Sequence, residues 1–537
     1  MLIGKAVVLK ITRHTAVQAG YTTFTERVFI TSKMQMPKNL PVLLLISVFI
    51  IATCGLIYEL IAGTLASYLL GDSITQFSTI IGVYLFSMGV GSWLSKYFEK
   101  NLLSWFIRIE ILVGLVGGTS STILFLVFES ASSFRLILYG LVSITGILVG
   151  LEIPLLMRIL KDRFEFKDLL SKVFTFDYIG ALVASLVFPL LLIPYLGLVR
   201  TAYMFGIFNV AVALLVCVSF KKEVKGVKQL LVAAIISLVG LLTGFVLADK
   251  ITNFSESLNY ADTIIYSKST PYQRIIITKR GRDLRLYLNG NLQFSSVDEY
   301  RYHEALIHPV MQALPQAKNV LVMGGGDGLA VREILKYPQI KSVTLVDLDH
   351  GMTDLFKSNP MLLALNKRSF LSPKVKVISA DAFAWAREQH QTYDAIIIDF
   401  PDPSNYSVGK LYTNTFYNVV KRLLDPSGIM VIQSTSPYVA PKSYWTVEKT
   451  LQSAGLHTVP YHNYVPSFGE WGYIMAMYKP VYHVPDKYVP GLRFMSKATL
   501  EQMLYFSKDM QRVPAQVNRL DNQILVKYFE EEWGAVN

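Results

Sequence analysis

Apolar and polar residues follow two different patterns along this chain. From residue 41 to residue 248 the sequence is dominated by long apolar runs. A run of about 20 apolar residues is what a helix needs to cross the hydrocarbon core of a bilayer. About seven such runs can be distinguished, and each predicts one membrane-spanning helix. They lie near residues 41–62, 75–95, 104–128, 134–157, 174–194, 199–219 and 229–248.

The second half of the chain has the pattern of a soluble α/β protein. Alternating runs at 274–278 and 284–288, the second followed by Asn289-Gly290, predict a small β-domain with a hairpin. From residue 319 onward, short apolar strands alternate with helical segments, which predicts a parallel sheet covered by helices on both faces. Strands are expected at 319–323, 342–346, 375–378, 394–398, 428–433 and 473–477.

These patterns divide the chain into five predicted parts. A basic leader (1–40) precedes an α-helical, multi-pass membrane domain (41–248). A small β-domain (255–315) leads into a Rossmann-like α/β domain (316–480), and a tail (481–537) follows. Ligands of such sheets bind at the C-terminal ends of the strands, where the strand order reverses.

Composition and charge agree with a membrane protein. Hydrophobic residues make up 52% of the chain, which is high for a soluble protein of this length. The net charge of +12 does not indicate a nucleic-acid partner, because the basic residues gather in alternate loops between apolar runs. The two cysteines, Cys54 and Cys217, lie in apolar runs and form neither a disulfide framework nor a metal-ligand pattern.

The same loop charges bear on the side of the membrane. By the positive-inside rule the N-terminus is cytoplasmic, and seven crossings would place the second half outside the cytoplasm. One crossing fewer would reverse this assignment, so the side of this multi-pass cell-membrane protein on which the second half lies stays open.

Four acidic residues lie in or near the apolar runs: Glu59, Glu110, Glu152 and Asp177. Charged groups at membrane depth are costly and often functional. They would suit a path for cations, or they lie near helix ends and pair with a neighbouring helix.

A glycine-rich turn, Gly324-Gly325-Gly326-Asp327-Gly328, follows the first strand of the large sheet. Glycine lets a backbone approach a ligand closely. Asp327 would repel a pyrophosphate or a carboxylate and attract an ammonium group. Its alternative role is to cap the helix that follows.

Acidic residues also follow the next three strands. Asp347 ends the second strand, where an acid typically accepts hydrogen bonds from ribose hydroxyls, whereas Asp349 could cap the next helix. Asp381-Ala382 follows the third strand and suits an adenine edge or a plain turn. Asp399 and Asp402 follow the fourth strand, and two carboxylates in one cleft suit a cationic amine and can accept its proton. A solvated Asp-Pro turn is the alternative.

Polar residues upstream of the sheet are candidates for a pocket wall. Gln273 follows Pro271-Tyr272, and Tyr302 and His303 lie in a segment rich in Tyr, His and Glu. His303 is a candidate general base or amine-binding group. The sequence contains no zinc-ligand spacing, no phosphate-binding Gly-Lys-Ser/Thr loop and no Gly-x-Ser-x-Gly.

Taken together and in this order, the motifs resemble the spermidine synthase family, the polyamine aminopropyltransferases. The resemblance extends from about residue 266 to residue 477, and the attached helices look like the membrane-spanning branch of that family. It implies transfer of an aminopropyl group from decarboxylated S-adenosylmethionine to putrescine or a related polyamine, giving spermidine and methylthioadenosine. A sulfonium already activates the reacting carbon, so neither a cofactor nor a metal is expected.

The resemblance also implies roles for individual residues. Asp399 would be the catalytic proton acceptor. Gln273, Asp347, Asp381 and Ala382 would bind the adenosyl donor; His303, Asp327, Asp399 and Asp402 would bind the polyamine; and Tyr302, Gln293 and Glu470 are further candidates. The chain departs from the family at Asp347, where glutamate is frequent, and at Phe468-Gly469-Glu470-Trp471, where many soluble members place a tyrosine by the amine site.

Two other functions compete with this one. A methyltransferase that uses ordinary S-adenosylmethionine shares the fold and the ribose contact of Asp347, but Asp327 and the pair of Asp399 and Asp402 argue against it. A membrane sensor or transporter could bind polyamine without turnover, and the intact aspartate pair favours catalysis instead. The expected partners are the polyamine and the lipid bilayer. Soluble members of the family tend to be dimers or tetramers, so a homo-oligomer is a further expectation.

Overall fold

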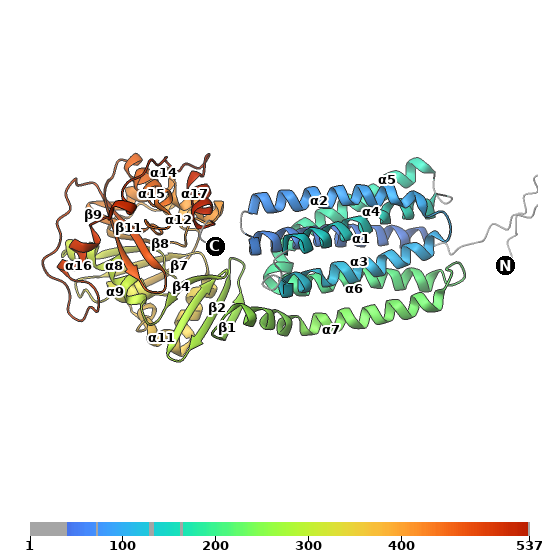
Figure 1. Ribbon diagram of the computed structural model, residues 1–537, viewed down its shortest axis with the longest axis horizontal. Helices are drawn as coiled ribbons and strands as arrows, with labels where there is room; N and C mark the ends of the chain where they lie inside the picture. Colours follow the sequence, from blue (N-terminus) through green and yellow to red (C-terminus); the bar gives the residue numbers. More distant parts are fainter. Residues whose placement is uncertain (1–39, 71–72, 128–133, 162–164, 535–537) are drawn as a thin grey trace, which may run out of the picture.

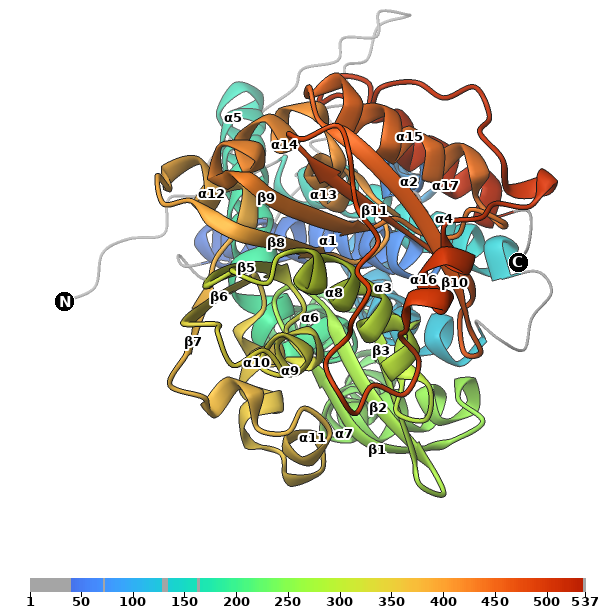
Figure 2. The same ribbon diagram turned by 90° about the vertical axis from the view of Figure 1, so that its left-hand side faces the viewer.

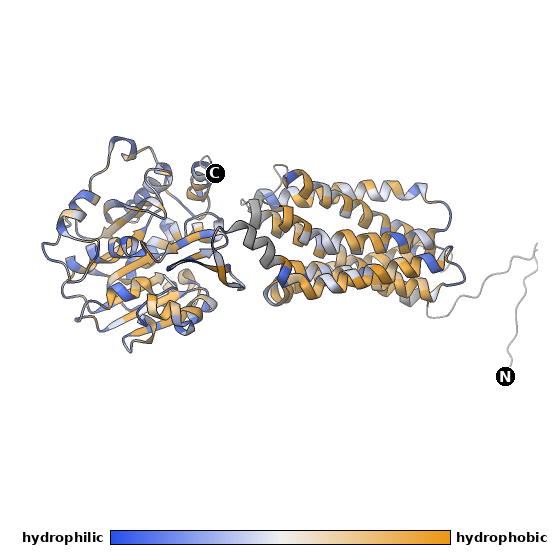
Figure 3. Cartoon of the chain, turned by 60° about the horizontal axis from the view of Figure 1, so that its bottom comes forward, coloured by the Kyte–Doolittle hydropathy of each residue, from blue (hydrophilic) through white to orange (hydrophobic). Residues whose placement is uncertain are grey.

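The computed structural model describes residues 40–70, 73–127, 134–161 and 165–534. A helical half and an α/β half lie end to end (Figure 1). The last helix of the first half, α7 (Val227–Asn259), runs directly into the first strand of the second. Hydrophobic residues extend along the helices of the helical half, whereas hydrophobic and hydrophilic residues are interspersed along the α/β half (Figure 3).

Seven long helices make up the described part of the helical half. Six precede α7: α1 (Leu40–Leu70), α2 (Ser73–Leu94), α3 (Leu102–Val127), α4 (Phe134–Leu160), α5 (Phe166–Val187) and α6 (Ile193–Ser219). By length and composition, six helical stretches could cross a membrane, because Phe166–Ser219 forms one continuous stretch of 54 residues. Gly197 interrupts that stretch with φ 73° and ψ 177°. Its two arms run in opposite directions, with α5 packed on α1 and α6 packed on α3 and α7 (Figure 1).

Close contacts between backbones hold the bundle together. A Cβ atom on Gly114 of α3 would lie 2.7 Å from the backbone oxygen of Gly206 of α6, and a Cβ atom on Gly206 would lie 2.6 Å from the backbone oxygen of Gly114. Only residues without a side chain allow two helices to approach so closely. This crossing fixes which polar side chains of α3 and α6 meet in the interior.

The α/β half begins with a four-stranded antiparallel sheet in the order β1-β2-β3-β4. Its strands are β1 (Thr263–Ser269), β2 (Arg274–Arg280), β3 (Asp283–Leu288) and β4 (Asn291–Ser295). Asn289 and Gly290 link β3 to β4 with positive φ angles of 50° and 83°. A two-residue type I′ turn requires such angles at both positions, so the predicted hairpin is confirmed.

A seven-stranded sheet in the order β10-β11-β9-β8-β5-β6-β7 forms the centre of the α/β half (Figure 2). Its strands are β5 (Asn319–Gly324), β6 (Ser342–Asp347), β7 (Val375–Ser379), β8 (Tyr393–Asp399), β9 (Leu424–Gln433), β10 (His457–Val465) and β11 (Gly469–Met477). The strands from β5 to β9 pair in parallel, as predicted. The hairpin of β10 and β11 is antiparallel, and β10 was not among the predicted strands. A proline such as Pro460 argues against a strand in the sequence. It is tolerated here because β10 lies at the edge of the sheet.

Helices cover both faces of this sheet. They are α8 (Glu299–Ala313), α9 (Leu329–Ile334), α10 (His350–Ser358), α11 (Pro360–Leu365), α12 (Ala382–Glu388), α13 (Tyr406–Gly409), α14 (Asn414–Val420), α15 (Pro441–Ser453), α16 (Lys497–Met503) and α17 (Ile524–Trp533). Successive residues of a strand point to opposite faces, so Leu321 and Val322 of β5 belong to two separate hydrophobic cores. The tail contributes Leu500 to one core and Leu525 to the other.

Strand order reverses at β5, which lies between β8 and β6. The chain continues from β5 to β6 and β7 on one side, and from β8 to β9 on the other. Loops that leave neighbouring strands in opposite directions open a crevice at the C-terminal ends of those strands. The glycine-rich turn, Asp347 and Asp399 follow or end these three central strands, so the fold brings them to one place.

Candidate active site

The glycine-rich turn after β5 is held between the ends of β6 and β8. Three of its glycines have positive φ: Gly324 (80°), Gly325 (67°) and Gly328 (75°). A Cβ atom on Gly324 would lie 2.2 Å from the backbone oxygen of Asp399, and one on Gly326 would lie 2.8 Å from Oδ2 of Asp347. Side chains at these positions would therefore collide with both neighbouring strands. The turn brings the carboxyl groups that end β6 and β8 against the same short backbone segment.

Asp347 lies half-buried beside this turn. Its Oδ1 accepts a hydrogen bond from the backbone N–H of Asp349 at 2.9 Å. Burial, reinforced by the nearby carboxylates of Asp349 and Asp327, raises the pKa of Asp347 to about 6. Asp349 caps α10 through Gly351, as the alternative reading of that residue predicted.

Gln273 reaches the same edge of the crevice. Its Nε2 donates to Oδ2 of Asp349 at 2.8 Å, and the Thr270 hydroxyl donates to the same oxygen at 2.8 Å. The segment between β1 and β2 is thereby tied to the loop after β6. Gln273 and Asp347 thus both neighbour Asp349, although they are far apart in the sequence.

Asp381 is engaged at the start of α12. Its Oδ1 accepts from the backbone N–H of Phe383 at 2.8 Å, and its Oδ2 pairs with Lys410 Nζ at 2.6 Å. Burial alone would raise the pKa of Asp381, but the hydrogen bond from Lys410 lowers it below its ordinary value. Ala382 is buried at the first position of the helix. The Asp381 carboxylate acts here as a helix cap, so its side of the crevice offers mainly backbone groups.

Asp399 lies at the end of β8 and faces α8. The Tyr302 hydroxyl donates to its Oδ1 at 2.5 Å. Burial raises the pKa of Asp399 to about 6, an effect that nearby Asp327 reinforces and that His303 and Tyr302 oppose. A carboxyl group with this pKa exists in both protonation states near neutral pH, which suits a group that takes up a proton.

His303 is buried behind this pair and held by Glu299, one turn earlier on α8. The Nδ1 atom of His303 lies 2.8 Å from Oε2 of Glu299. Burial alone would lower the pKa of His303, but the Glu299 carboxylate raises it to about 9. His303 is therefore an imidazolium at neutral pH, with Asp327 and Asp399 among the carboxylates that stabilise its charge.

Arg332 of α9 completes this buried network. Its Nη1 and Nη2 donate to the two carboxylate oxygens of Glu299 at 2.8 and 2.9 Å. Such fork-shaped pairing is the strong geometry for arginine and carboxylate. The contacts of Glu299 were not predicted from the sequence. The contact with His303 could have been found, because the two residues stand four apart on a helix, a spacing that brings side chains together.

Asp327 lies within the glycine-rich turn, half-buried. Its Oδ1 accepts a hydrogen bond from the backbone N–H of Leu329 at 2.9 Å, which is the capping contact given above as its alternative role. Burial raises the pKa of Asp327, and the positive charge of His303 opposes that rise. The same carboxylate can therefore both hold the turn and face a cation.

Asp402 lies on the loop after β8 and contacts Gln433, the last residue of β9. Gln433 Nε2 is 3.2 Å from Oδ1 of Asp402 and 2.6 Å from the backbone oxygen of Phe400. Burial raises the pKa of Asp402 to about 7. The Oε1 atom of Gln433 accepts from Nε1 of Trp471 at 3.2 Å, so Trp471 also belongs to this end of the crevice. Neither Gln433 nor Trp471 was among the predicted site residues.

Two of the further candidates have other partners. Gln293 of β4 donates to the backbone oxygen of Asn291 at 3.2 Å. Glu470 lies 2.5 Å from Nδ1 of His462 and points to the opposite face of β11 from Trp471, because neighbouring residues of a strand alternate. No contact in the described part of the chain joins Glu470 to the crevice, so Trp471 is the residue of this segment that faces the site.

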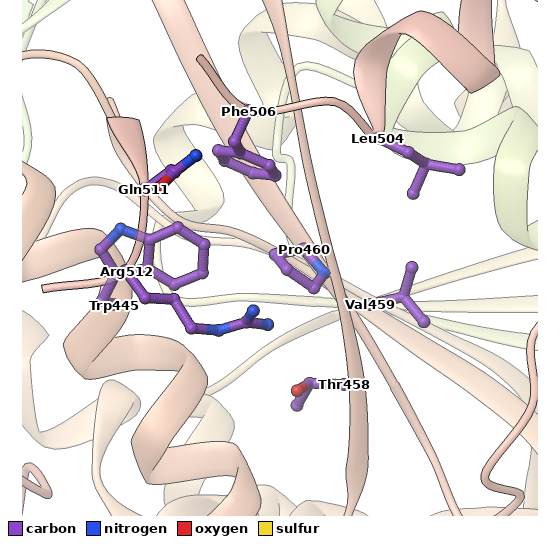
Figure 4. A pocket seen from close by; sticks show the side chains of 8 residues that line it. All are labelled: Trp445, Thr458, Val459, Pro460, Leu504, Phe506, Gln511 and Arg512. Atoms are coloured by element: carbon purple, nitrogen blue, oxygen red, sulfur yellow. The ribbon is translucent and has the colours of Figure 1, made fainter. Parts of the chain in front are cut away.

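A separate cavity of about 310 Å³ opens on the outer side of the α/β half (Figure 4). It lies between α15, the edge strand β10 and the segment that follows α16. It is lined by Trp445, Thr458, Val459, Pro460, Leu504, Phe506, Gln511 and Arg512. None of the predicted site residues lines it. This cavity is therefore separate from the predicted site at the strand ends.

Along that crevice the side chains form a row of carboxyl groups with different environments. Asp347 lies at one side, Asp327 and Asp399 at the centre, and Asp402 at the other side. Raised pKa values at several grouped acids are typical of a functional site. The row can bind positively charged groups, and Asp399 is placed to receive a proton.

Comparison with known proteins gives a consistent result. Residues 299–486 match the family model described as the spermine/spermidine synthase domain. The chain is 53% identical over 493 residues to a polyamine aminopropyltransferase of Leptospira interrogans, covering 92% of this chain and 99% of that protein. It is 53% identical over 503 residues to polyamine aminopropyltransferase 2 of Ralstonia nicotianae, covering 92% of this chain and 98% of that protein.

Among solved structures, the crystal structure of spermidine synthase from Thermotoga maritima matches with a TM-score of 0.42 and 22% identity. That match covers 51% of this chain and 88% of the other. The alignments with the two sequence relatives are much longer than the α/β half, so those relatives share the helical half as well.

Proposed function

Because the chain belongs to the polyamine aminopropyltransferase family, and is thus a transferase that uses decarboxylated S-adenosylmethionine, we propose that putrescine is its acceptor and Asp399 its proton acceptor. The products are then spermidine and methylthioadenosine. The observation that carries this proposal is the position of Asp399, half-buried at the end of β8, hydrogen-bonded to Tyr302 and facing the cation of His303.

The reaction is a displacement at carbon. The lone pair of the acceptor nitrogen attacks the methylene carbon attached to the donor sulfonium, and the carbon–sulfur bond breaks with its electrons going to sulfur. Methylthioadenosine leaves. The attacking nitrogen of putrescine is an ammonium before the reaction, and the Asp399 carboxylate takes up the proton that it must lose to free this lone pair, so the product nitrogen stays a secondary ammonium. Holding the nitrogen and the carbon about 3 Å apart supplies much of the rate enhancement, because it removes the entropy cost of a bimolecular encounter.

The donor binds at the side of the crevice where Asp347 lies. Asp347 places its carboxylate next to the glycine-rich turn, where it can accept from ribose hydroxyls. Gln273 lies beside it, and the backbone around Asp381 and Ala382 faces the adenine. The decarboxylated donor ends in an ammonium group alone, whereas ordinary S-adenosylmethionine carries a carboxylate beside its ammonium. The Asp327 carboxylate attracts the ammonium group and repels the carboxylate, so it favours the decarboxylated donor.

The acceptor binds at the other side of the crevice, where Asp402 lies. Putrescine carries an ammonium group at each end, and a row of carboxylates matches two charges separated by an aliphatic chain. Asp402, oriented by Gln433, holds the distal ammonium. The ring of Trp471 packs against Phe468 at 5.3 Å between centroids and gives the aliphatic chain an apolar wall.

Turnover by the purified full-length protein tests the proposal. The protein receives putrescine with either decarboxylated or ordinary S-adenosylmethionine, and methylthioadenosine and spermidine are measured by mass spectrometry. Asp399→Asn should reduce turnover by about 10²- to 10⁴-fold, the contribution of a positioned base. Asp425→Asn is the matched control. Asp425 lies near the start of β9, at the opposite end of that strand from Gln433, and accepts a hydrogen bond from Ser427, so this variant should keep full activity.

Each other outcome favours a competing function. Methylated product from ordinary S-adenosylmethionine would indicate a methyltransferase. Polyamine binding without product from either donor would indicate a sensor or transporter. Full activity of Asp399→Asn would contradict the role of Asp399 while leaving the transferase in place.

We further propose that the helical half spans the cell membrane seven times, with the α/β half on the face opposite the cytoplasm. The break at Gly197 supports counting α5 and α6 as separate crossings, since about 20 residues suffice for each. Basic residues gather at the end of the bundle away from the α/β half: Lys96, Lys100, Lys161, Lys167, Lys221, Lys222, Lys225 and Lys228. At the other end, Arg200 pairs with Asp249 at 2.6 Å. The positive-inside rule assigns the basic end to the cytoplasm.

Cysteine labelling in intact cells tests this orientation. The native Cys54 and Cys217 are buried, so introduced cysteines report with little background. Ser427→Cys in the α/β half should react with a membrane-impermeant maleimide, and Lys222→Cys should react only after permeabilisation. The reverse pattern would place the enzyme on the cytoplasmic face.

A further inference from the structure

Two acidic side chains meet in the interior of the helical half. Glu110 of α3 and Glu152 of α4 are 0% and 1% exposed. The close crossing of α3 and α6 brings Asn209 to Glu110, and its Nδ2 donates to Oε2 of Glu110 at 2.9 Å. The Tyr58 hydroxyl of α1 donates in turn to Oδ1 of Asn209 at 3.0 Å. Four helices thus contribute to one buried polar cluster.

The cluster lacks hydrogen-bond donors. Within the described ranges, Oε1 of Glu110 and both carboxyl oxygens of Glu152 have no partner. The carboxyl groups nevertheless lie within hydrogen-bonding reach of each other. An ionised carboxylate only accepts hydrogen bonds, so two carboxyl groups can bond each other only when one of them carries a proton.

Among the residues that the structure describes, no basic side chain faces the two acids. The titratable groups that face them are Cys54 and Tyr58 of α1, Tyr84 of α2 and Asp177 of α5. These are thiol, phenol and carboxyl groups. In the part of the chain that the structure describes, neither Glu110 nor Glu152 forms an ion pair with lysine, arginine or histidine. Two uncompensated negative charges at this depth would cost far more free energy than binding a proton.

We propose that Glu110 and Glu152 form a proton-binding site in the helical half, with one exchangeable proton shared between their carboxyl groups. A proton fits this position because the carboxyl oxygens are close enough to share it. An ammonium nitrogen would have to separate them, and the packing of α3 against α4 and α6 opposes that. The site lies in the other half of the chain from the crevice and goes beyond aminopropyl transfer: the helical half binds a proton as well as anchoring the enzyme.

Infrared spectroscopy of the full-length protein in lipid nanodiscs tests this site. The quantity is the carbonyl stretching band of a protonated carboxylic acid at neutral pH, taken as wild type minus the double variant Glu110→Gln with Glu152→Gln. Subtraction cancels the carboxyl groups of the α/β half. A positive band that shifts in deuterated water is expected. Glutamine matches glutamate in size, and unchanged methylthioadenosine turnover shows that the double variant is folded.

The surface residue Asp249 provides the matched control. It pairs with Arg200 at 2.6 Å, away from the two glutamates, so Asp249→Asn should leave the band unchanged. Absence of the band from the difference spectrum would mean that both carboxyl groups are ionised, and it would overturn the proposal. Loss of the band on adding spermidine at constant pH would also overturn it, because the bound cation would then be an ammonium.

Discussion

Removing the Tyr302 hydroxyl isolates the role of Asp399 in the reaction. In Tyr302→Phe the ring that packs against His303 and Tyr473 stays, and only the 2.5 Å hydrogen bond to Oδ1 of Asp399 is lost. A hydrogen bond to a charged group contributes about 1.5–3 kcal/mol. Since 1.36 kcal/mol corresponds to one pKa unit, the pKa of Asp399 should rise by roughly one to two units from its value of about 6.

The ratio of variant to wild-type kcat/KM, measured at each pH, shows this shift directly. Asp399 must be ionised to accept a proton, so activity in both proteins falls as the pH drops through its pKa. The ratio should be near one above about pH 9 and should fall to roughly 0.1–0.01 below pH 6. Asp402, whose pKa is raised to about 7, titrates in both proteins and cancels in the ratio.

A matched variant separates this effect from a general disturbance of the pocket. Tyr473→Phe removes a hydroxyl 3.5 Å from the backbone oxygen of Tyr302, without touching the bond to Asp399. Its ratio should stay constant with pH. A ratio for Tyr302→Phe that is equally low at every pH would refute the reasoning, because the loss would then come from misplacement of the substrate and not from the titration of Asp399.

Three further changes probe other parts of the site. The raised pKa of Asp402 means that folding disfavours its ionised form, so the folded protein loses stability as the pH rises from 3.8 to about 7. Asp402→Asn cannot ionise, so above pH 7 it should be more stable than wild type by up to roughly 4 kcal/mol. Below pH 4 the two proteins should be equally stable in thermal unfolding. Arg332→Met leaves the buried Glu299 carboxylate without its fork-shaped partner and should cost about 3–5 kcal/mol in calorimetric unfolding, whereas adding Glu299→Gln should restore part of that stability. Gly326→Ala would place a Cβ atom 2.8 Å from Oδ2 of Asp347 and displace that carboxylate. The KM for the donor should then rise roughly ten- to a hundredfold, while the KM for the acceptor stays within a factor of two. Equal increases in both constants would contradict the assignment of Asp347 to the donor.

Periodicity was sufficient to predict the two halves of this chain. Apolar runs of helix-spanning length and short alternating strands reflect local geometry, which repeats every 3.6 or every 2 residues. The glycine-rich turn and the acids at the strand ends followed from the same logic, since a parallel sheet gathers its strand ends at one edge. The comparisons confirm the predicted family. The edge strand β10 was missed because Pro460 breaks the expected pattern.

The environment of each acid was decided only by the tertiary structure. Asp399 and Tyr302 are 97 residues apart, and Asp402 and Gln433 are 31 apart, yet each pair is joined by a hydrogen bond. Glu470 and Trp471 are neighbours in sequence, and the alternation of β11 directs only Trp471 toward the site.

Glu110 was recognisable in the sequence as an acid at membrane depth, but its contact with Glu152 depends on how α3, α4 and α6 pack. Sequence alone determined which chemical groups the protein has and which local elements carry them. Their partners, and hence their burial and their affinity for protons, depend on contacts between segments that only the packing of the whole chain brings together.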